Sequence, residues 1–224
     1  MGGKCIIMGF CNKLSILSKM SWTKFIYWNF LSSKVKRCGK GFMIPYRHSV
    51  INIGEGSQVI LHDGHFVVNA AKPSGSAAEA YLLLRKNAVL EIQSRCNLCY
   101  KATIEIHDNA RVEIGSAYIN SDAVILAGKH IKLGEGCLIS RMVFIYDADH
   151  HDFLDEEGNV INPPREVLIG NHVWIGLKTT ILRGSRIGDG AVVAAESLVG
   201  GKVKAGTMAA GNPARSYAEV RWHV

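Results

Sequence analysis

Residues 169–204 read IGNHVW IGLKTT ILRGSR IGDGAV VAAESL VGGKVK, which is six consecutive blocks of six residues. Each block begins with Ile or Val, and a small or β-branched residue follows four positions later. A period of six fits neither the two-residue repeat of an ordinary strand nor the 3.6-residue repeat of an α-helix. It predicts short strands joined by turns, with glycines near the corners and two inward positions per block. The first positions are Ile169, Ile175, Ile181, Ile187, Val193 and Val199, and the second are Val173, Thr179, Ser185, Ala191, Ser197 and Val203.

The same repeat continues upstream of this stretch. It is clear in LGEGCL and ISRMVF, residues 133–144, and weaker between residues 51 and 120. Three blocks close one triangular coil, so we predict an all-β stack of parallel coils over about residues 41–217. The repeat is interrupted at about residues 72–87 and 147–166. Long excursions from a compact scaffold often carry function, so the residues of these two loops are of special interest.

Composition limits the possible classes of protein. The chain has 224 residues, of which 48% are hydrophobic and 20% charged, as in globular proteins. No uncharged apolar run approaches the roughly 20 residues that a membrane span needs. The six cysteines lack the spacing of a disulfide framework, which favours a reducing compartment and a cytoplasmic protein. We interpret Cys96 and Cys99 as buried free thiols, and Cys137 as a core residue.

The positive charge is concentrated at the N-terminus. Residues 1–54 contain nine Lys or Arg and no acid, whereas the other 170 residues contain 17 bases and 19 acids. The basic segment 1–40 includes SWTKFIYWNFL, residues 21–31, whose apolar positions predict a helix. This segment could bind the anionic inner face of a membrane, or dock its aromatic side chains on the main domain or on a sister subunit. Nothing resembles a nucleic-acid module, and residues 218–224 are read as a C-terminal tail.

Two further stretches carry a family resemblance. DADHHDFLDEEGNVINPPREVLIGNHVWIG (residues 147–176) and AAGNPAR (residues 209–215) resemble motifs of the hexapeptide-repeat O-acetyltransferases that modify sugars. The chain is most similar to those acting on capsular or other surface polysaccharides, and the likeness covers about residues 105–217. It implies a left-handed parallel β-helix, acetyl-CoA as the acyl donor, a saccharide acceptor, and a homotrimer with its sites between subunits.

The resemblance also assigns a catalytic histidine. The family's loop pattern S-D-x-H places the histidine at His151 and the aspartate at Asp149, with Ala148 in place of the serine. A related pattern selects His150 instead, but DEEGNVINPP aligns without gaps only when His151 is chosen. An imidazole with a pKa near about 6.5 suits the removal of a proton from a sugar hydroxyl group that attacks a thioester directly.

A carboxylate on the other ring nitrogen would hold the required tautomer of this histidine. Asp149 is the candidate, and Asp147 or Asp152 could serve in its place. The resemblance further places Trp174 beside the acetyl group, as an apolar wall of the site. Backbone N–H groups of the turn from Trp174 to Leu177 are candidates to stabilise the oxyanion.

The coenzyme contacts are likewise implied by the resemblance. They fall on Gly176, Leu177, Ala195, Gly200, Gly201, Lys202 and Arg215. Arg215 is the candidate for a phosphate contact, because a guanidinium group suits phosphate oxygens, and Lys202 and Lys204 are the alternatives. The small residues would let the backbone approach the pantetheine arm closely.

Other functions remain open on the same fold. One is N-acetylation of an amino sugar or of an antibiotic. A second is a zinc enzyme of the γ-carbonic anhydrase type, but the histidines do not have its spacing, and we predict no metal site. A third is a non-catalytic scaffold, which would need neither the histidine loop nor the C-terminal motif.

Overall fold

The computed structural model describes residues 17–223 of the chain. Its strands form three sheets, in which hydrogen-bonded neighbours are separated by two intervening strands in the sequence. Sheet I consists of β1 (Val35–Arg37), β4 (Gln58–Leu61), β7 (Val89–Ile92), β10 (Arg111–Ile114), β13 (His130–Leu133), β16 (Val167–Ile169), β19 (Arg186–Ile187) and β22 (Lys202–Val203). Sheet II consists of β2 (Met43–Pro45), β5 (Phe66–Ala70), β8 (Cys96–Cys99), β11 (Ala117–Ile119), β14 (Cys137–Ile139), β17 (Trp174–Ile175), β20 (Val192–Val193), β23 (Thr207–Gly211) and β24 (Ala214–Glu219). Sheet III consists of β3 (Ser49–Ile53), β6 (Ala80–Leu84), β9 (Thr103–Ile106), β12 (Val124–Ala127), β15 (Phe144–Tyr146), β18 (Thr180–Ile181) and β21 (Leu198–Val199).

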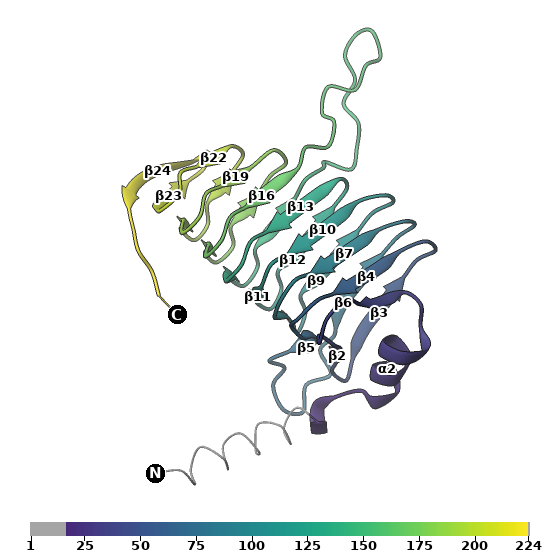
Figure 1. Ribbon diagram of the computed structural model, residues 1–224. Helices are drawn as coiled ribbons and strands as arrows, with labels where there is room; N and C mark the ends of the chain where they lie inside the picture. Colours follow the sequence, from purple (N-terminus) through teal and green to yellow (C-terminus); the bar gives the residue numbers. More distant parts are fainter. Residues whose placement is uncertain (1–16, 224) are drawn as a thin grey trace, which may run out of the picture.

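This strand order is that of a three-sided parallel β-helix. The chain passes through sheets I, II and III in turn, and each coil stacks on the one before it (Figure 1). All pairings within the sheets are parallel except that of β23 with β24, an antiparallel hairpin at the C-terminal end. Equivalent residues lie in register, as in the row Ile139, Ile175 and Val193. The predicted parallel β-helix is therefore confirmed.

The core consists of the inward residues that the six-residue repeat identifies. All first and second positions of the six blocks are buried. Two hydroxyl groups at second positions bond to backbone carbonyl oxygens: Thr179 Oγ1 donates to Ala194 O at 3.0 Å, and Ser185 Oγ donates to Val199 O at 2.9 Å. A small polar residue is accommodated at this buried position because its hydroxyl group finds a backbone carbonyl oxygen to bond to.

Three boundaries differ from those read in the sequence. Strand β6 lies inside the first predicted excursion, because Ala80, Leu82 and Leu84 alternate inward and are buried, so this excursion ends before residue 80. Strand β1 lies inside the segment expected to be helical up to residue 40. Strand β24 extends two residues into the expected C-terminal tail. Residues 147–166 leave the stack as a long projecting loop (Figure 1).

A short helical segment covers the N-terminal end of the stack (Figure 1). It comprises the α-helix α2 (Trp22–Ile26) and the π-helical turn η1 (Tyr27–Leu31), in which Trp28 and Asn29 are buried. Asn29 Nδ2 donates to Met43 O at 2.8 Å and to Phe25 O at 2.8 Å, and Asn29 Oδ1 accepts from Met43 N at 3.0 Å. The amide thus bonds to both backbone groups of Met43 in the first strand of sheet II. The described part of the segment docks on the main domain, while residues 1–16 lie outside the described structure.

Among residues 17–223, we find no helix that combines the length and the apolar character needed to cross a bilayer.

Replacing Asn29 with alanine should destabilise the fold. The change removes three hydrogen bonds and leaves the buried N–H of Met43 unpaired, which costs about 1–3 kcal/mol. We expect a loss of that size in the free energy of unfolding, measured by urea denaturation. Asn52→Ala is the matched control, because Asn52 is exposed in β3 and its removal should change the free energy by less than about 0.5 kcal/mol. Equal effects of the two changes would contradict this role of Asn29.

Candidate functional site

Asp147 anchors the projecting loop to the coil below it. Its side chain is fully buried, and its carboxylate accepts hydrogen bonds from the backbone N–H groups of Gly128 at 2.6 Å, Lys129 at 2.9 Å and His130 at 2.5 Å. At the other end of the loop, Arg165 N donates to Asp147 O at 2.9 Å. The loop therefore leaves and rejoins the stack at one corner, between sheets III and I.

Asn162 ties the two arms of the loop together. It is 4% exposed, and its Nδ2 donates to His151 O at 2.8 Å and to Asp149 Oδ2 at 2.9 Å. Its Oδ1 accepts from Phe153 N at 2.7 Å. Sequence reasoning did not assign a role to this residue. The signal was present in the I-N-P motif at residues 161–163, where an amide can bond to both arms of a loop.

His150 lies against the coils at the base of the loop. Its ring centroid is 4.4 Å from that of His107, which follows β9 two coils earlier, and its backbone φ is +59°. Both rings line a pocket of about 420 Å³ that also includes Arg85, His151 and Asp152. Burial is the largest cause that lowers the pKa of His107, and the neighbouring His150 and Arg85 lower it further. The lowered pKa favours the neutral form of His107.

The assignment of the base to His151 stays a prediction, whereas the predicted contact of Asp149 with an imidazole is not present in the structure. His151 lines the same pocket, and it is His150 whose ring packs against the coil. Asp149 does not bond to an imidazole, because its Oδ2 accepts from Asn162 and from Arg183 Nε at 2.8 Å. The hydrogen bond from Asn162, followed by the contribution of Arg183, lowers the pKa of Asp149. Asp149 thus shapes the loop, and Asp147 is occupied by backbone N–H groups.

Trp174 lies on a different side of the β-helix from His150. It points outward from sheet II, is 40% exposed, and its Nε1 donates to Ser140 Oγ at 3.1 Å. The His150 loop instead leaves the corner between sheets III and I, which is opposite sheet II in a three-sided coil. Within one chain, the structure does not bring the predicted histidine and tryptophan together.

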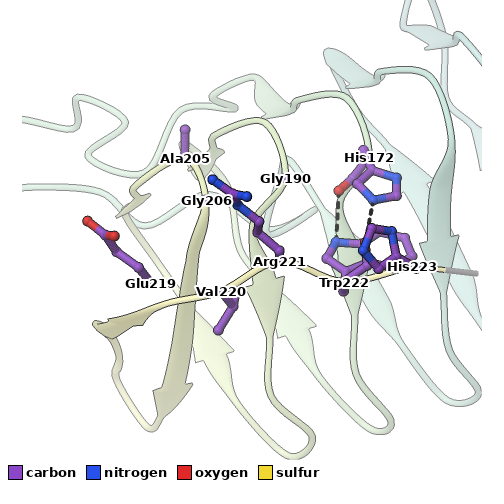
Figure 2. A pocket seen from close by; sticks show the side chains of 9 residues that line it. All are labelled: His172, Gly190, Ala205, Gly206, Glu219, Val220, Arg221, Trp222 and His223. Carbon is purple, nitrogen blue, oxygen red and sulfur yellow. Dashed lines mark hydrogen bonds between the residues drawn. The ribbon is translucent and has the colours of Figure 1, made fainter.

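The C-terminal tail approaches Trp174 instead. The Trp222 ring stacks on His172 at 3.8 Å between centroids, and two hydrogen bonds of 3.0 Å join the two residues (Figure 2). The Trp222 ring also lies 6.1 Å from that of Trp174. The tail, including Arg221 and His223, lines one side of an open pocket of about 610 Å³. Sequence reasoning missed this contact because nothing in residues 218–224 indicates where the tail returns.

The predicted coenzyme contacts fall into three groups. Gly176, Leu177 and Ala195 lie on adjacent coils at the corner between sheets II and III, and a Cβ on Gly176 would come within 2.6 Å of Ala195 N. Gly200, Gly201 and Lys202 follow at the next corner of the last coil, and Arg215 lies on β24.

The first group also contains the candidate oxyanion donor. Gly176 N donates to Val193 O at 2.8 Å and is therefore occupied. Leu177 N has no hydrogen-bond acceptor among the described residues, so this N–H is free to bind an oxyanion.

A groove lies on sheet II near its N-terminal end, on the same face as Trp174. Trp174, Leu138, Tyr118 and Asn97 lie side by side in register on successive coils. The groove, of about 620 Å³, is lined by Tyr118 and Asn97 and by further polar side chains that include Tyr46 and Arg95. Aromatic rings, amides and cations on one extended surface can hydrogen-bond and stack against a chain of sugars.

Among the described residues, the structure shows the burial of the cysteine thiols and the arrangement of possible metal ligands. Cys96, Cys99 and Cys137 are buried free thiols, and burial raises the pKa of each, that of Cys137 to about 11. Such thiols are poor nucleophiles. Among residues 17–223, no group of three or more His, Cys, Asp or Glu side chains has the geometry to hold a metal ion.

Comparison of the sequence with known proteins identifies O-acetyltransferases as relatives of this chain. The chain is 30% identical over 145 residues to galactoside O-acetyltransferase of Escherichia coli K12, covering 58% of this chain and 70% of that protein. It is 35% identical over 106 residues to the putative lipopolysaccharide biosynthesis O-acetyl transferase WbbJ of the same strain, covering 43% of this chain and 54% of that protein. The chain thus spans only about half the length of the second relative. No protein-family profile matches the chain.

A solved structure shares the fold. The polysialic acid O-acetyltransferase OatWY superposes with a TM-score of 0.61 at 23% identity, over 85% of this chain and 91% of that one. The predicted left-handed form of the parallel β-helix is confirmed.

The Asp149 carboxylate should stabilise the loop only where it is ionised. Because its folded pKa is lowered, the stabilisation is present above its usual value of 3.8 and is lost as the pH falls through the folded pKa. Asp149→Asn should therefore lower the melting temperature at pH 7, with a free-energy cost below about 1 kcal/mol for this partly exposed pair. The difference from wild type should disappear in calorimetry at acid pH. Glu156→Gln, an exposed position at the loop tip, leaves this pair intact and tests for a general effect of removing a carboxylate.

Proposed function

We propose that this chain, which belongs to the hexapeptide-repeat acetyltransferase family and is an acyltransferase with acetyl-CoA as its donor, acetylates a hydroxyl group of a surface polysaccharide or of its precursor. The observation that carries the proposal is the His150–His107 pair in the pocket at the base of the clamped loop. A sugar hydroxyl group must lose its proton as it attacks a thioester, and a neutral imidazole can accept that proton.

His150 acts as the general base in this proposal. It takes the proton of the acceptor hydroxyl group while the oxygen forms a bond to the thioester carbon. The carbon–sulfur bond then breaks, and the imidazolium returns the proton to the departing thiolate of coenzyme A. Cys96, Cys99 and Cys137 are buried, and the exposed Cys38 lies beside β1 at the far end of the stack, so the transfer is proposed to be direct rather than through a cysteine acyl-enzyme. The N–H of Leu177 would stabilise the oxyanion.

The site is completed between subunits. His150 and Trp174 lie on different sides of one β-helix, so a reaction that uses both needs a second chain. We expect a homotrimer in which the loop of one subunit lies opposite sheet II of the next. Four apolar side chains of the loop, Phe153, Leu154, Val160 and Ile161, are exposed in the single chain and suit such a contact.

An extended saccharide is the acceptor that fits the groove along sheet II. The groove includes Tyr118 and Asn97, which lie in the same row as Trp174, and its polar and aromatic lining suits a chain of sugars. The lipopolysaccharide role in the name of WbbJ and the galactoside in the name of the other relative both support a saccharide hydroxyl group as the acceptor.

Replacing the base should abolish transfer. His150→Ala should lower kcat/KM by roughly 100- to 10,000-fold, the usual contribution of a general base. The measurement is release of the coenzyme A thiol in the presence of a panel of capsular and lipopolysaccharide glycans. His151→Ala is the matched control and should retain most of the activity. A large loss in His151→Ala alone would move the base by one residue, and wild type without turnover on any glycan would contradict the acceptor class.

Mixed oligomers should reveal the shared site. His150→Ala and Trp174→Ala are expected to be inactive or weakly active separately. When the two are unfolded and refolded together, interfaces that combine an intact His150 with an intact Trp174 should regain activity. Recovery should follow the fraction of such interfaces, measured by titrating one variant with the other. Persistent inactivity of the mixture, with oligomers of normal mass, would contradict a site shared between subunits.

A further inference from the structure

The segment that closes the N-terminal end of the stack turns an apolar surface outward. We call this surface the aromatic face and define it as Trp22, Ile26, Tyr27, Phe30 and Leu31. Each of these side chains is between 48% and 72% exposed. Positions 22, 26 and 30 are four residues apart, so their side chains share one side of the helical segment. Trp28 and Asn29 occupy the opposite side and are buried against the first coil.

The aromatic face is held in place rather than loosely attached. The Phe25 ring contacts those of Trp22, Phe30 and Phe42, with centroids 5.8 to 6.1 Å apart. The Arg37 guanidinium lies over the rings of Phe30 and Phe42, at 4.9 and 4.6 Å from their centroids. The hydrogen bonds of Asn29 fasten the same segment to Met43. Such a preformed surface loses little conformational entropy when it binds.

The segment that carries the aromatic face is basic, and one acid from the next coil, Asp63, lies beside Lys40. Residues 17–54 carry seven Lys or Arg and no Asp or Glu. Lys36, Arg37 and Lys40 are exposed on and beside β1, the strand that follows the helical segment. Aromatic and aliphatic side chains ringed by cations match the interface of an anionic bilayer, which offers acyl chains beneath negative headgroups.

We propose that the aromatic face docks the enzyme, end-on, on the surface of an anionic lipid bilayer. The apolar side chains enter the boundary between headgroups and acyl chains, and the cations of the β1 region contact the headgroups. This inference concerns where the enzyme acts. It places the protein at the inner face of the cytoplasmic membrane, with the stack of coils extending away from it.

Vesicle binding tests the docking directly. The full chain is sedimented with vesicles of phosphatidylglycerol and phosphatidylcholine in equal amounts, or of phosphatidylcholine alone. We expect binding to the anionic vesicles that weakens with salt, and at least tenfold weaker binding to the neutral ones. The double variant Lys36→Gln, Lys40→Gln should bind about 25-fold less tightly, at about fivefold per charge near the surface. A wild type that does not sediment, or that binds both vesicle types equally, would overturn the proposal.

Substitutions in the aromatic face test whether its apolar side chains contribute to vesicle binding. Ile26→Glu and Leu31→Glu should each lower vesicle binding at least tenfold, with unchanged melting temperatures. Tyr217→Glu is the matched control, because Tyr217 is 64% exposed on β24 at the opposite end of the stack. It should bind like wild type. If Leu31→Glu instead lowered the molar mass in light scattering, the aromatic face would be a contact between copies of the chain and the proposal would fail. These measurements need no acceptor, so they stand apart from any failure of the proposed reaction.

Discussion

Inward aliphatic side chains stack on their equivalents from coil to coil, and this stacking fixes the position of every other group in the protein. The parallel sheets hold Ile139, Ile175 and Val193 in register, and the same holds along the other two sides. Each coil therefore gives its neighbour a flat and nearly identical surface. The rigid prism lets side chains that are remote in sequence, such as His107 and His150, come together at one corner.

The projecting loop depends on the buried carboxylate of Asp147. A buried carboxyl group is costly unless hydrogen bonds replace those that it makes to water in the unfolded chain, and here three backbone N–H groups do so. The same three N–H groups belong to the coil below, so the carboxylate joins the loop to the scaffold. Asn162 then fixes the two arms relative to each other, and this pair of contacts gives the adjacent His150 a defined backbone.

Much of this architecture could be predicted from the sequence, because the repeat specifies two inward residues per side of the coil. The C-terminal coils were read correctly since each strand has only two residues and the blocks stay in phase. The upstream coils were harder, because strands of four or five residues and coils of unequal length disturb the period, and β6 was read as loop. The choice between His150 and His151 depends on which ring meets His107, a contact across 43 residues. The return of Trp222 to His172 is equally non-local, and residues 218–224 contain no signal for it.

The spacing of the coils also sets the distances between groups along the axis of the β-helix. Strand β3 at the capped end and β15 at the root of the loop are four pairings apart in sheet III, which at about 4.8 Å per pairing is roughly 19 Å. Gain or loss of one complete coil between them would change this separation by a single step and keep every corner facing the same way. The distance between the N-terminal cap and the projecting loop can therefore change only by whole coils. A β-helix with a different number of coils between them would hold the same loop at a different distance from its cap.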